Sequence, residues 1–193
     1  MRAFVAILLD EAVRRELDSA IERLRPVARD VAWIAAGNLH LTLKFLGAVP
    51  EERLAAIVAA LAPSGADLHP FEARIRGLGA FPSVARPRVI WAGVLDGAPE
   101  MIELARRVDT SLAALGFARE ERPFSPHVTL GRVRRPGRDP TLGEALTGGS
   151  AREFGRIRVP GAFLMRSELS PRGARYTELA SVPLGGPVRV FRH

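Results

Sequence analysis

The chain has 193 residues and no cysteine, which excludes disulfide bonds, cysteine-ligated zinc sites and a thiol nucleophile. Hydrophobic residues make up 47% of it, enough for one sizeable core or two small lobes and too few for two large independent domains. The 28 basic and 21 acidic residues give a formal charge of +7, which suits an anionic partner such as nucleic acid.

The first part of the chain reads as strand, helix and strand. Residues 3–9 form an apolar run that is too short for a signal peptide and ends in acidic residues, so we expect a buried strand. A helical pattern follows over 10–25, then a short extended segment at 31–34 and a strand at 39–46. No stretch approaches the roughly 18 uninterrupted apolar residues of a membrane span. The sequence therefore predicts a soluble, cytoplasmic protein.

The same order returns in the middle of the chain, after a helix opened by Pro50 and a strand at 71–81. Residues 88–95 predict a strand, 99–115 a helix and 126–133 a strand. This repeat predicts an internal strand–helix–strand duplication, about 3–46 and 88–133. We expect one two-lobed domain over 1–193, of the α+β class. Its two pseudo-symmetric lobes of mainly antiparallel sheet should carry helices outside and a cleft between them.

The last part of the chain is less regular. Residues 141–154 favour at most one weak helix. Two strands at 162–169 and 175–184 should be joined by a hairpin turn at 170–173, and a last short strand should cover 188–191. His69 is expected at the surface and His193 in a disordered tail.

One motif occurs twice, at the strands that close the two repeated units. His40-Leu41-Thr42-Leu43 and His127-Val128-Thr129-Leu130 both alternate polar and apolar residues. Successive side chains of a strand point to opposite faces, so each His shares a face with a Thr while the apolar residues enter the core. A single strand histidine is more often structural, but two copies of the motif in a chain with four histidines indicate one shared active site.

Two facing histidines are suited to phosphodiester chemistry. An ordinary pKa of about 6.5 lets one be neutral and the other protonated near neutral pH. One can then take a proton from the attacking oxygen while the other gives a proton to the leaving oxygen. The threonine hydroxyls can donate hydrogen bonds to the non-bridging oxygens, where charge sits in the transition state.

Other chemistries fit the sequence less well. A zinc site would need three or more convergent His, Cys or carboxylate ligands, and two threonines are poor substitutes. A Ser-His-Asp triad uses one base rather than a symmetric pair, and neither a Gly-x-Ser-x-Gly elbow nor a nucleotide-binding P-loop is present. We therefore expect no metal and no cofactor.

With these motifs the chain resembles the RNA 2′,3′-cyclic phosphodiesterases of bacteria and archaea, also described as 2′-5′ RNA ligases, in the two-histidine phosphoesterase superfamily. Flanking segments that fit the family, in the same order, are Arg2–Ala6, Phe124–Pro126, and Leu164–Leu169 through Gly173 and Tyr176. The resemblance covers nearly the whole chain. It implies a two-lobed α+β fold and metal-independent hydrolysis of a terminal cyclic phosphate to a 2′-phosphomonoester. It also implies that His40 is the proton donor and His127 the proton acceptor.

Three further residues are candidates for contacts with the substrate. The family usually has an arginine after the second motif, but by strand parity Arg132 reaches the cleft only if the strand twists or bulges. Lys44 shares the face of the first motif, and either touches the ligand or stays in solvent at the rim. Tyr176, the only tyrosine, can stack a base or simply pack in the hairpin.

Several alternatives stay open at this stage. All basic residues but Lys44 are arginine, so a composition bias explains the charge as well as function does. The arginine-rich loop at 132–138 is either solvated or in contact with RNA. The expected partners are RNA ends or nucleotides with a 2′,3′-cyclic phosphate, acted on by a monomer. A 2′-5′ RNA ligase working in the reverse direction and a non-catalytic RNA-end-binding module are the alternative functions.

Overall fold

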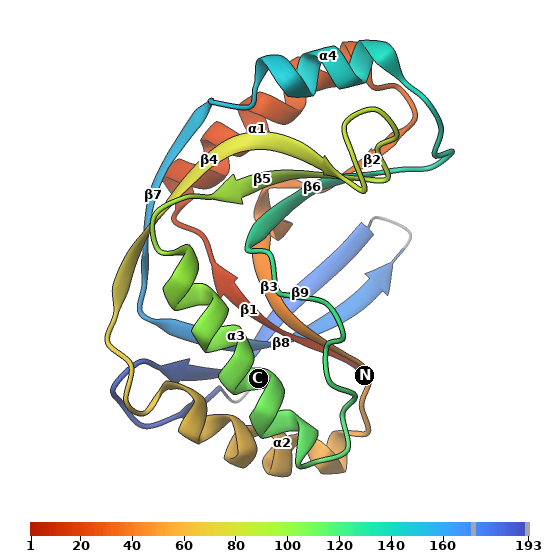
Figure 1. Cartoon of the computed structure of the whole chain (residues 1–193). Helices are drawn as coiled ribbons and strands as arrows, with labels where there is room; N and C mark the ends of the chain where they lie inside the picture. The colour runs from red at the N-terminus through yellow and green to blue at the C-terminus, as the bar shows by residue number, and fades with distance from the viewer. Residues whose placement is uncertain (171–172, 192–193) are drawn as a thin grey trace.

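A computed structural model describes residues 1–170 and 173–191, which form a single curved antiparallel sheet with helices on its outside (Figure 1). The strand order is β10-β9-β8-β1-β3-β6-β5-β4-β7, and β2 pairs with β6. The strands are β1 (Arg2–Leu8), β2 (Val31–Trp33), β3 (His40–Ala48), β4 (Phe71–Phe81), β5 (Val89–Val94), β6 (His127–Val133), β7 (Glu153–Val159), β8 (Gly161–Ser170), β9 (Gly173–Pro183) and β10 (Arg189–Val190). The predicted α+β class with a mainly antiparallel sheet is confirmed.

The sheet consists of two halves that meet at a single residue pair. The first half holds β10, β9, β8, β1 and β3, and the second half holds β6, β2, β5, β4 and β7. Between β3 and β6 the only residues paired in the described structure are Leu41 and Val128. These are the middle residues of the two His-x-Thr motifs, so the junction of the halves places both motifs next to each other.

In residues 1–170 and 173–191, four α-helices cover the sheet, and two of them cross from one half to the other. The α-helices are α1 (Glu11–Leu24), α2 (Leu54–Leu61), α3 (Ala98–Ala113) and α4 (Pro140–Gly148). Helix α1 connects β1 to the strands that follow but packs against β7 of the second half, whereas α3 connects β5 to β6 but packs against β3 of the first half (Figure 1). The predicted internal duplication stays a prediction; the β1–β3 and β5–β6 pairs with their crossing helices agree with it.

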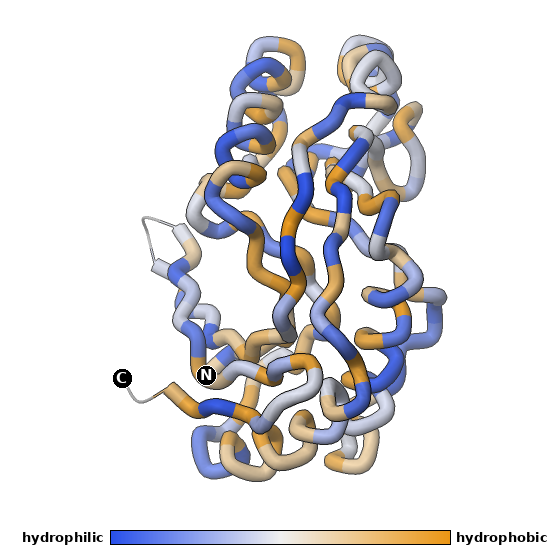
Figure 2. The backbone as a smooth tube through the Cα atoms, turned by 90° about the vertical axis from the view of Figure 1, so that its left-hand side faces the viewer, coloured by the Kyte–Doolittle hydropathy of each residue, from blue (hydrophilic) through white to orange (hydrophobic). Residues whose placement is uncertain are grey.

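Amphipathic patterns explain why these segments form a core. Apolar residues recur every three or four positions on α1, where Val13, Leu17 and Ile21 are buried, and on α3, where Leu104 and Val108 are buried. Hydrophobic and hydrophilic residues alternate along the strands in the middle of Figure 2. One cluster of buried side chains runs through both halves, so the halves share a core.

Two β-bulges interrupt the alternation just after the motifs. In the β1–β3 pair, Val5 lies opposite Lys44 and Ala6 opposite Thr42, so that Leu43 is an extra residue. In the β5–β6 pair, the register shifts between Gly131 and Thr129, so that Leu130 is the extra residue. A bulge reverses which face the following side chains occupy. Beyond each motif, therefore, strand parity no longer predicts which side a residue faces.

The structure adds to and corrects the expected elements. The weak helix that the sequence predicts in 141–154 is observed as α4. Strand β7, which follows it, was not predicted. Strands β8 and β9 pair up to Ser170 and Gly173, as expected for a hairpin; the turn residues 171–172 and the tail residue His193 lie outside the described residues. His69 is exposed, as predicted. No helix in residues 1–170 or 173–191 is long and apolar enough to cross a membrane.

Candidate active site

His40 stands at the first position of β3, and its ring is held in one orientation. Its Nδ1 donates to the carbonyl oxygen of Asn38 at 2.7 Å, while its Nε2 is 3.0 Å from Thr42 Oγ1. The Asn38 side chain in turn donates to Ala174 O at 2.7 Å, which ties this corner to β9. The carbonyl accepts only from an N–H, so neutral His40 carries its proton on Nδ1 and has an unprotonated Nε2.

His127 stands at the first position of β6 and repeats this arrangement. Its Nδ1 donates to Ser125 O at 2.7 Å, again the carbonyl oxygen two residues earlier. The edge of its ring meets Phe81, with ring centroids 5.0 Å apart. Both histidines thus have Nδ1 occupied by a backbone carbonyl, which leaves Nε2 of each as the nitrogen available for chemistry.

Two hollows that share several lining residues lie along the junction of the halves. One, of about 370 Å³, is lined by His40 and is called here the His40-side hollow. The other, of about 710 Å³, is lined by His127 and is called the His127-side hollow. Thr42, Thr129 and Arg132 line both. The four motif residues expected in the cleft therefore line these two hollows: each histidine lines one of them, and both threonines line the two.

Arg132 reaches these hollows because of the bulge in β6. The bulge at Leu130 turns Arg132 to the same face as Thr129. The strand thus bulges, as Arg132 requires in order to reach the cleft. Arg132 lines the His40-side hollow together with Tyr176 and the His127-side hollow together with His127, and its positive charge lowers the pKa of both groups.

Tyr176 on β9 forms a wall of the His40-side hollow. Its ring stands edge-on to His40 with centroids 5.2 Å apart and to Phe4 with centroids 5.1 Å apart. Phe4 also lies 4.8 Å from the His40 ring. The aromatic contacts hold His40 in place and give this hollow an apolar side.

The expectation that Lys44 shares the motif face is wrong, although Lys44 still lines part of the His127-side hollow. The bulge at Leu43 turns Lys44 towards the core, where only 3% of the residue is exposed. Its ammonium group binds Asp109 Oδ1 at 2.6 Å and Ala118 O at 2.7 Å. Phe45 takes the cleft face instead and is 63% exposed. Phe45 and Arg132 thus occupy equivalent positions, five residues after the histidine of each motif.

Burial shifts the pKa values of the aromatic and imidazole groups in these hollows. It lowers the pKa of His40 below its ordinary value, against the opposing effect of the hydrogen bond to Asn38. It also lowers the pKa of His127, where the bond to Ser125 opposes the shift and the charge of Arg132 adds to it. Burial raises the pKa of Tyr176, against the effect of Arg132. Both histidines are therefore mainly neutral at neutral pH in the ligand-free protein.

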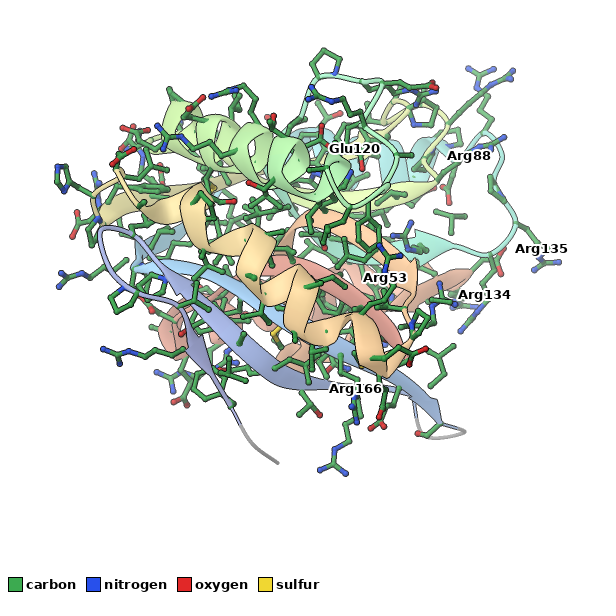
Figure 3. All side chains as sticks on the ribbon, turned by 90° about the horizontal axis from the view of Figure 1, so that it is seen from below. Arg53, Arg88, Glu120, Arg134, Arg135 and Arg166 are labelled. Atoms are coloured by element: carbon green, nitrogen blue, oxygen red, sulfur yellow. The ribbon has the colours of Figure 1, made fainter. Side chains whose placement is uncertain are left out.

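The other charged residues that line the hollows are mainly basic. Arg2 lines the His40-side hollow, and Arg88 and Arg122 line the His127-side hollow, against one acidic residue, Glu120. Of the arginine-rich loop, Arg134 and Arg135 lie with Arg88 at one edge of the molecule (Figure 3). Within the described residues no group of three or more His, Cys, Asp or Glu side chains is placed to hold a metal ion.

Sequence reasoning missed several residues that shape the site. Asn38 and Ser125 act through their backbone carbonyls, so their side-chain types carry no signal of it. Phe4 and Phe81 come from other strands and reach the histidines only through the sheet topology. Strand alternation places Phe45 in the core, and only the bulge at Leu43 brings it to the cleft.

The sequence and fold agree with one known class of proteins. The family model for the 2′-5′ RNA ligase superfamily matches residues 12–168, and the chain belongs to this superfamily.

Several relatives of the chain have the same name, RNA 2′,3′-cyclic phosphodiesterase. The RNA 2′,3′-cyclic phosphodiesterase of Methanothermobacter thermautotrophicus is 38% identical over 180 residues, 93% of this chain and 96% of the relative. The Thermus thermophilus protein of the same name is 39% identical over 192 residues, 96% of this chain and 91% of the relative.

Solved structures are similar to this chain over nearly its whole length. A crystal structure from Thermus thermophilus superposes with a TM-score of 0.78 at 35% identity, covering 96% of this chain and 99% of that one. Escherichia coli LigT complexed with 3′-AMP superposes with a TM-score of 0.76 at 26% identity, covering 96% of this chain and 98% of that one.

Proposed function

We propose that this protein hydrolyses 2′,3′-cyclic phosphodiesters at RNA ends to 2′-phosphomonoesters, without a metal ion, with His40 and His127 as the acid–base pair. The observation that carries the proposal is the matched pair of imidazoles. Each has Nδ1 fixed by the carbonyl two residues earlier and Nε2 left for the reaction, on two strands that pair at Leu41 and Val128.

The reaction follows from an in-line displacement at phosphorus. A water oxygen attacks the cyclic phosphate while His127 Nε2 takes one proton from that water. The bond from phosphorus to the 3′ oxygen breaks on the opposite side, and protonated His40 gives its Nε2 proton to that oxygen. The product carries a 2′-phosphate and a 3′-hydroxyl group. Each positioned acid or base typically contributes about 10²–10⁴-fold to such a rate.

The hydrogen bond between His40 and Thr42 supports the role of His40 as the acid. When His40 is neutral, the Thr42 hydroxyl donates to Nε2. When His40 is protonated, Nε2–H donates instead, and the hydroxyl proton of Thr42 is freed for a phosphate oxygen. Thr129 and Arg132 supply further donors to the charge that the phosphate carries in the transition state.

Relatives and charge support RNA as the substrate class. The relatives at 30–39% identity are named RNA 2′,3′-cyclic phosphodiesterase, and LigT was crystallised with 3′-AMP. The basic lining of both hollows and the aromatic rings of Phe4, Phe45 and Tyr176 suit a nucleotide with a phosphate group. A monomeric, cytoplasmic enzyme remains part of this proposal.

The superfamily description also favours the joining of RNA ends as a second activity. If a 5′-hydroxyl group replaces water beside His127, the same displacement forms a 2′-5′ bond. Water at its bulk concentration should make hydrolysis dominant at ordinary RNA concentrations.

A single incubation tests the proposal. A short RNA ending in a 2′,3′-cyclic phosphate is treated with the protein in the presence of EDTA, and the end group is identified by phosphatase sensitivity and mass. We expect a 2′-phosphate product from the wild-type protein and little product from His40→Ala or His127→Ala. Activity that is lost with EDTA and restored by zinc or magnesium would overturn the two-histidine mechanism.

A further inference from the structure

Lys44 is the one lysine among the 28 basic residues of the chain, and its ammonium group is buried. Besides its bonds to Asp109 and to Ala118 O, the ammonium lies 3.6 Å from the carboxylate of Glu120. Asp109 Oδ1 also accepts from the backbone N–H of Glu120 at 3.3 Å. This group of contacts, called here the Lys44 cluster, ties β3 to α3 and to the loop that follows α3.

The geometry of the Lys44 cluster suits the side chain of lysine better than that of arginine. An ammonium group is a compact charge with three donors, whereas a guanidinium group is a wide planar fork. Composition favours arginine everywhere else in the chain, so the local surroundings, not the composition, explain the lysine. A buried charge of this kind is stable only while its partners stay in place.

The loop held by the cluster leads directly to His127. Arg53 binds Leu115 O at 2.6 Å and its guanidinium lies 5.0 Å from the Phe117 ring, so the start of the loop is anchored as well. Arg53 and Glu120 both lie near the C-terminal end of α3 (Figure 3). Within the described part of the chain, residues 121–124 make no hydrogen bond, so the Lys44 cluster is the last polar anchor before Ser125, while Phe124 packs against the hydrophobic core.

The short segment after the Lys44 cluster is stiff enough for the cluster to determine where Ser125 lies. Residues 121–126 include Pro123 and Pro126, whose rings fix φ and stiffen the backbone. The segment provides Arg122 and Phe124 to the lining of the His127-side hollow. At its end, Ser125 O accepts from His127 Nδ1.

We propose that Lys44 and Asp109 are positioning residues: through the loop they place Ser125 O and so fix the Nδ1–H tautomer and the orientation of His127. The link to catalysis rests on the proposed function, but the link to the tautomer does not. The inward turn of Lys44 also accompanies the outward turn of Phe45 to the cleft, whereas His40 lies before the bulge and is held separately.

The tautomers of the two histidines test this directly, because His40 serves as an internal control. His40 is held by Asn38 O, which the Lys44 cluster does not touch. In the double variant Lys44→Met with Asp109→Leu, both charges are removed together, which avoids a buried unpaired charge. Imidazole ¹⁵N chemical shifts should show that His127 loses its preference for Nδ1–H while His40 keeps it.

Kinetics and a control variant complete the test. kcat/KM of the double variant on a cyclic-phosphate substrate should fall about 10–100-fold, as for a misplaced catalytic group. The control is Leu146→Ala in the core of α4, which should lower the melting temperature at least as much and leave both tautomers unchanged.

Two results would overturn the proposal. One is a folded double variant in which His127 keeps its tautomer; the other is an equal change at His40 and His127, which would indicate general loosening. If wild-type protein hydrolyses no cyclic phosphate, the proposed function fails, and the tautomer measurement still decides the present inference.

Discussion

At the residue scale, the two histidines differ in what their Nε2 atoms contact. Nε2 of His40 is within hydrogen-bond distance of Thr42, whereas Nε2 of His127 has no hydrogen bond to any described residue. A free lone pair suits the group that takes a proton from water. A bonded Nε2 that can become a donor suits the group that delivers one. The asymmetry therefore supports His127 as base and His40 as acid, two roles that nearly identical sequence motifs cannot distinguish.

The threonines provide the first prediction. Thr42→Val and Thr129→Val each remove a donor to the transition-state phosphate, so kcat should fall by roughly 10–10³-fold with little change in melting temperature. Thr147→Val is the control, because its hydroxyl bonds Gly143 O within α4. Wild-type rates in both motif variants would remove the threonines from the mechanism.

The pH dependence of Arg132→Met provides the second prediction. Burial is the largest cause of the lowered pKa of His127, and the charge of Arg132 lowers it further, so the variant should raise that pKa. A base that must be neutral then loses activity at a higher pH, so the acidic limb of the kcat/KM profile moves upward. Arg132 does not contribute to the shift of His40, and the alkaline limb should stay in place. Movement of the alkaline limb alone would reverse the assignment of the two histidines.

At the element scale, strand alternation predicted correctly which side chains share a face only as far as the bulges. It placed His40 and Thr42, and His127 and Thr129, on common faces. It failed at Lys44, one residue past the bulge. A bulge depends on how neighbouring strands pair, and the sequence of one strand does not reveal it.

Strand β7 was missed for a related reason. Its buried residues, Phe154, Ile157 and Val159, are spaced by three and then by two positions instead of alternating. Gly155 lies between them with φ of 118°, a conformation that side-chain-bearing residues rarely adopt, and the β4–β7 register shifts beside it. The alternation of buried and exposed residues, on which the prediction of a strand depends, is absent in β7.

The third prediction tests the bulge in β6. A Cβ atom at Gly131 would lie 2.6 Å from Val31 Cγ1 and 2.8 Å from Trp33 Cε3. Gly131→Ala should therefore push β2 from β6 and displace Arg132, costing about 1–3 kcal/mol of unfolding free energy and lowering kcat/KM. Gly137→Ala is the control, because no atom lies within 4 Å of its added Cβ. Equal stability of the two variants in urea would contradict the tight packing around this bulge.

At the scale of the whole molecule, the crossing helices hold the two halves together. The sheet alone joins them through one residue pair, but α1 and α3 each pack on the half opposite to the strands they connect. The buried core is continuous across the junction. The shared core and the crossing helices therefore hold together the two strands that carry the histidines.

The partly buried histidines should make the fold sensitive to acid, which is the fourth prediction. Burial lowers the pKa of His40 and His127 in the folded protein, whereas in the unfolded chain both should titrate near about 6.5. Below that pH the unfolded chain binds more protons, so the free energy of unfolding should fall as the pH drops from about 6.5 through the lowered values. The double variant His40→Gln, His127→Gln should lose less stability between pH 7.5 and 5.5 in urea titrations. An unchanged loss would show that other groups cause the acid sensitivity.

The most direct test of the central claim replaces the bridging 3′ oxygen of the cyclic phosphate with sulfur. A thiolate leaves without protonation, so the acid becomes dispensable while the base stays essential. The proposed mechanism predicts that this substrate largely restores the activity of His40→Ala and does not restore that of His127→Ala. Rescue of His127→Ala instead, or a 3′-phosphate on the product of the normal substrate, would contradict it.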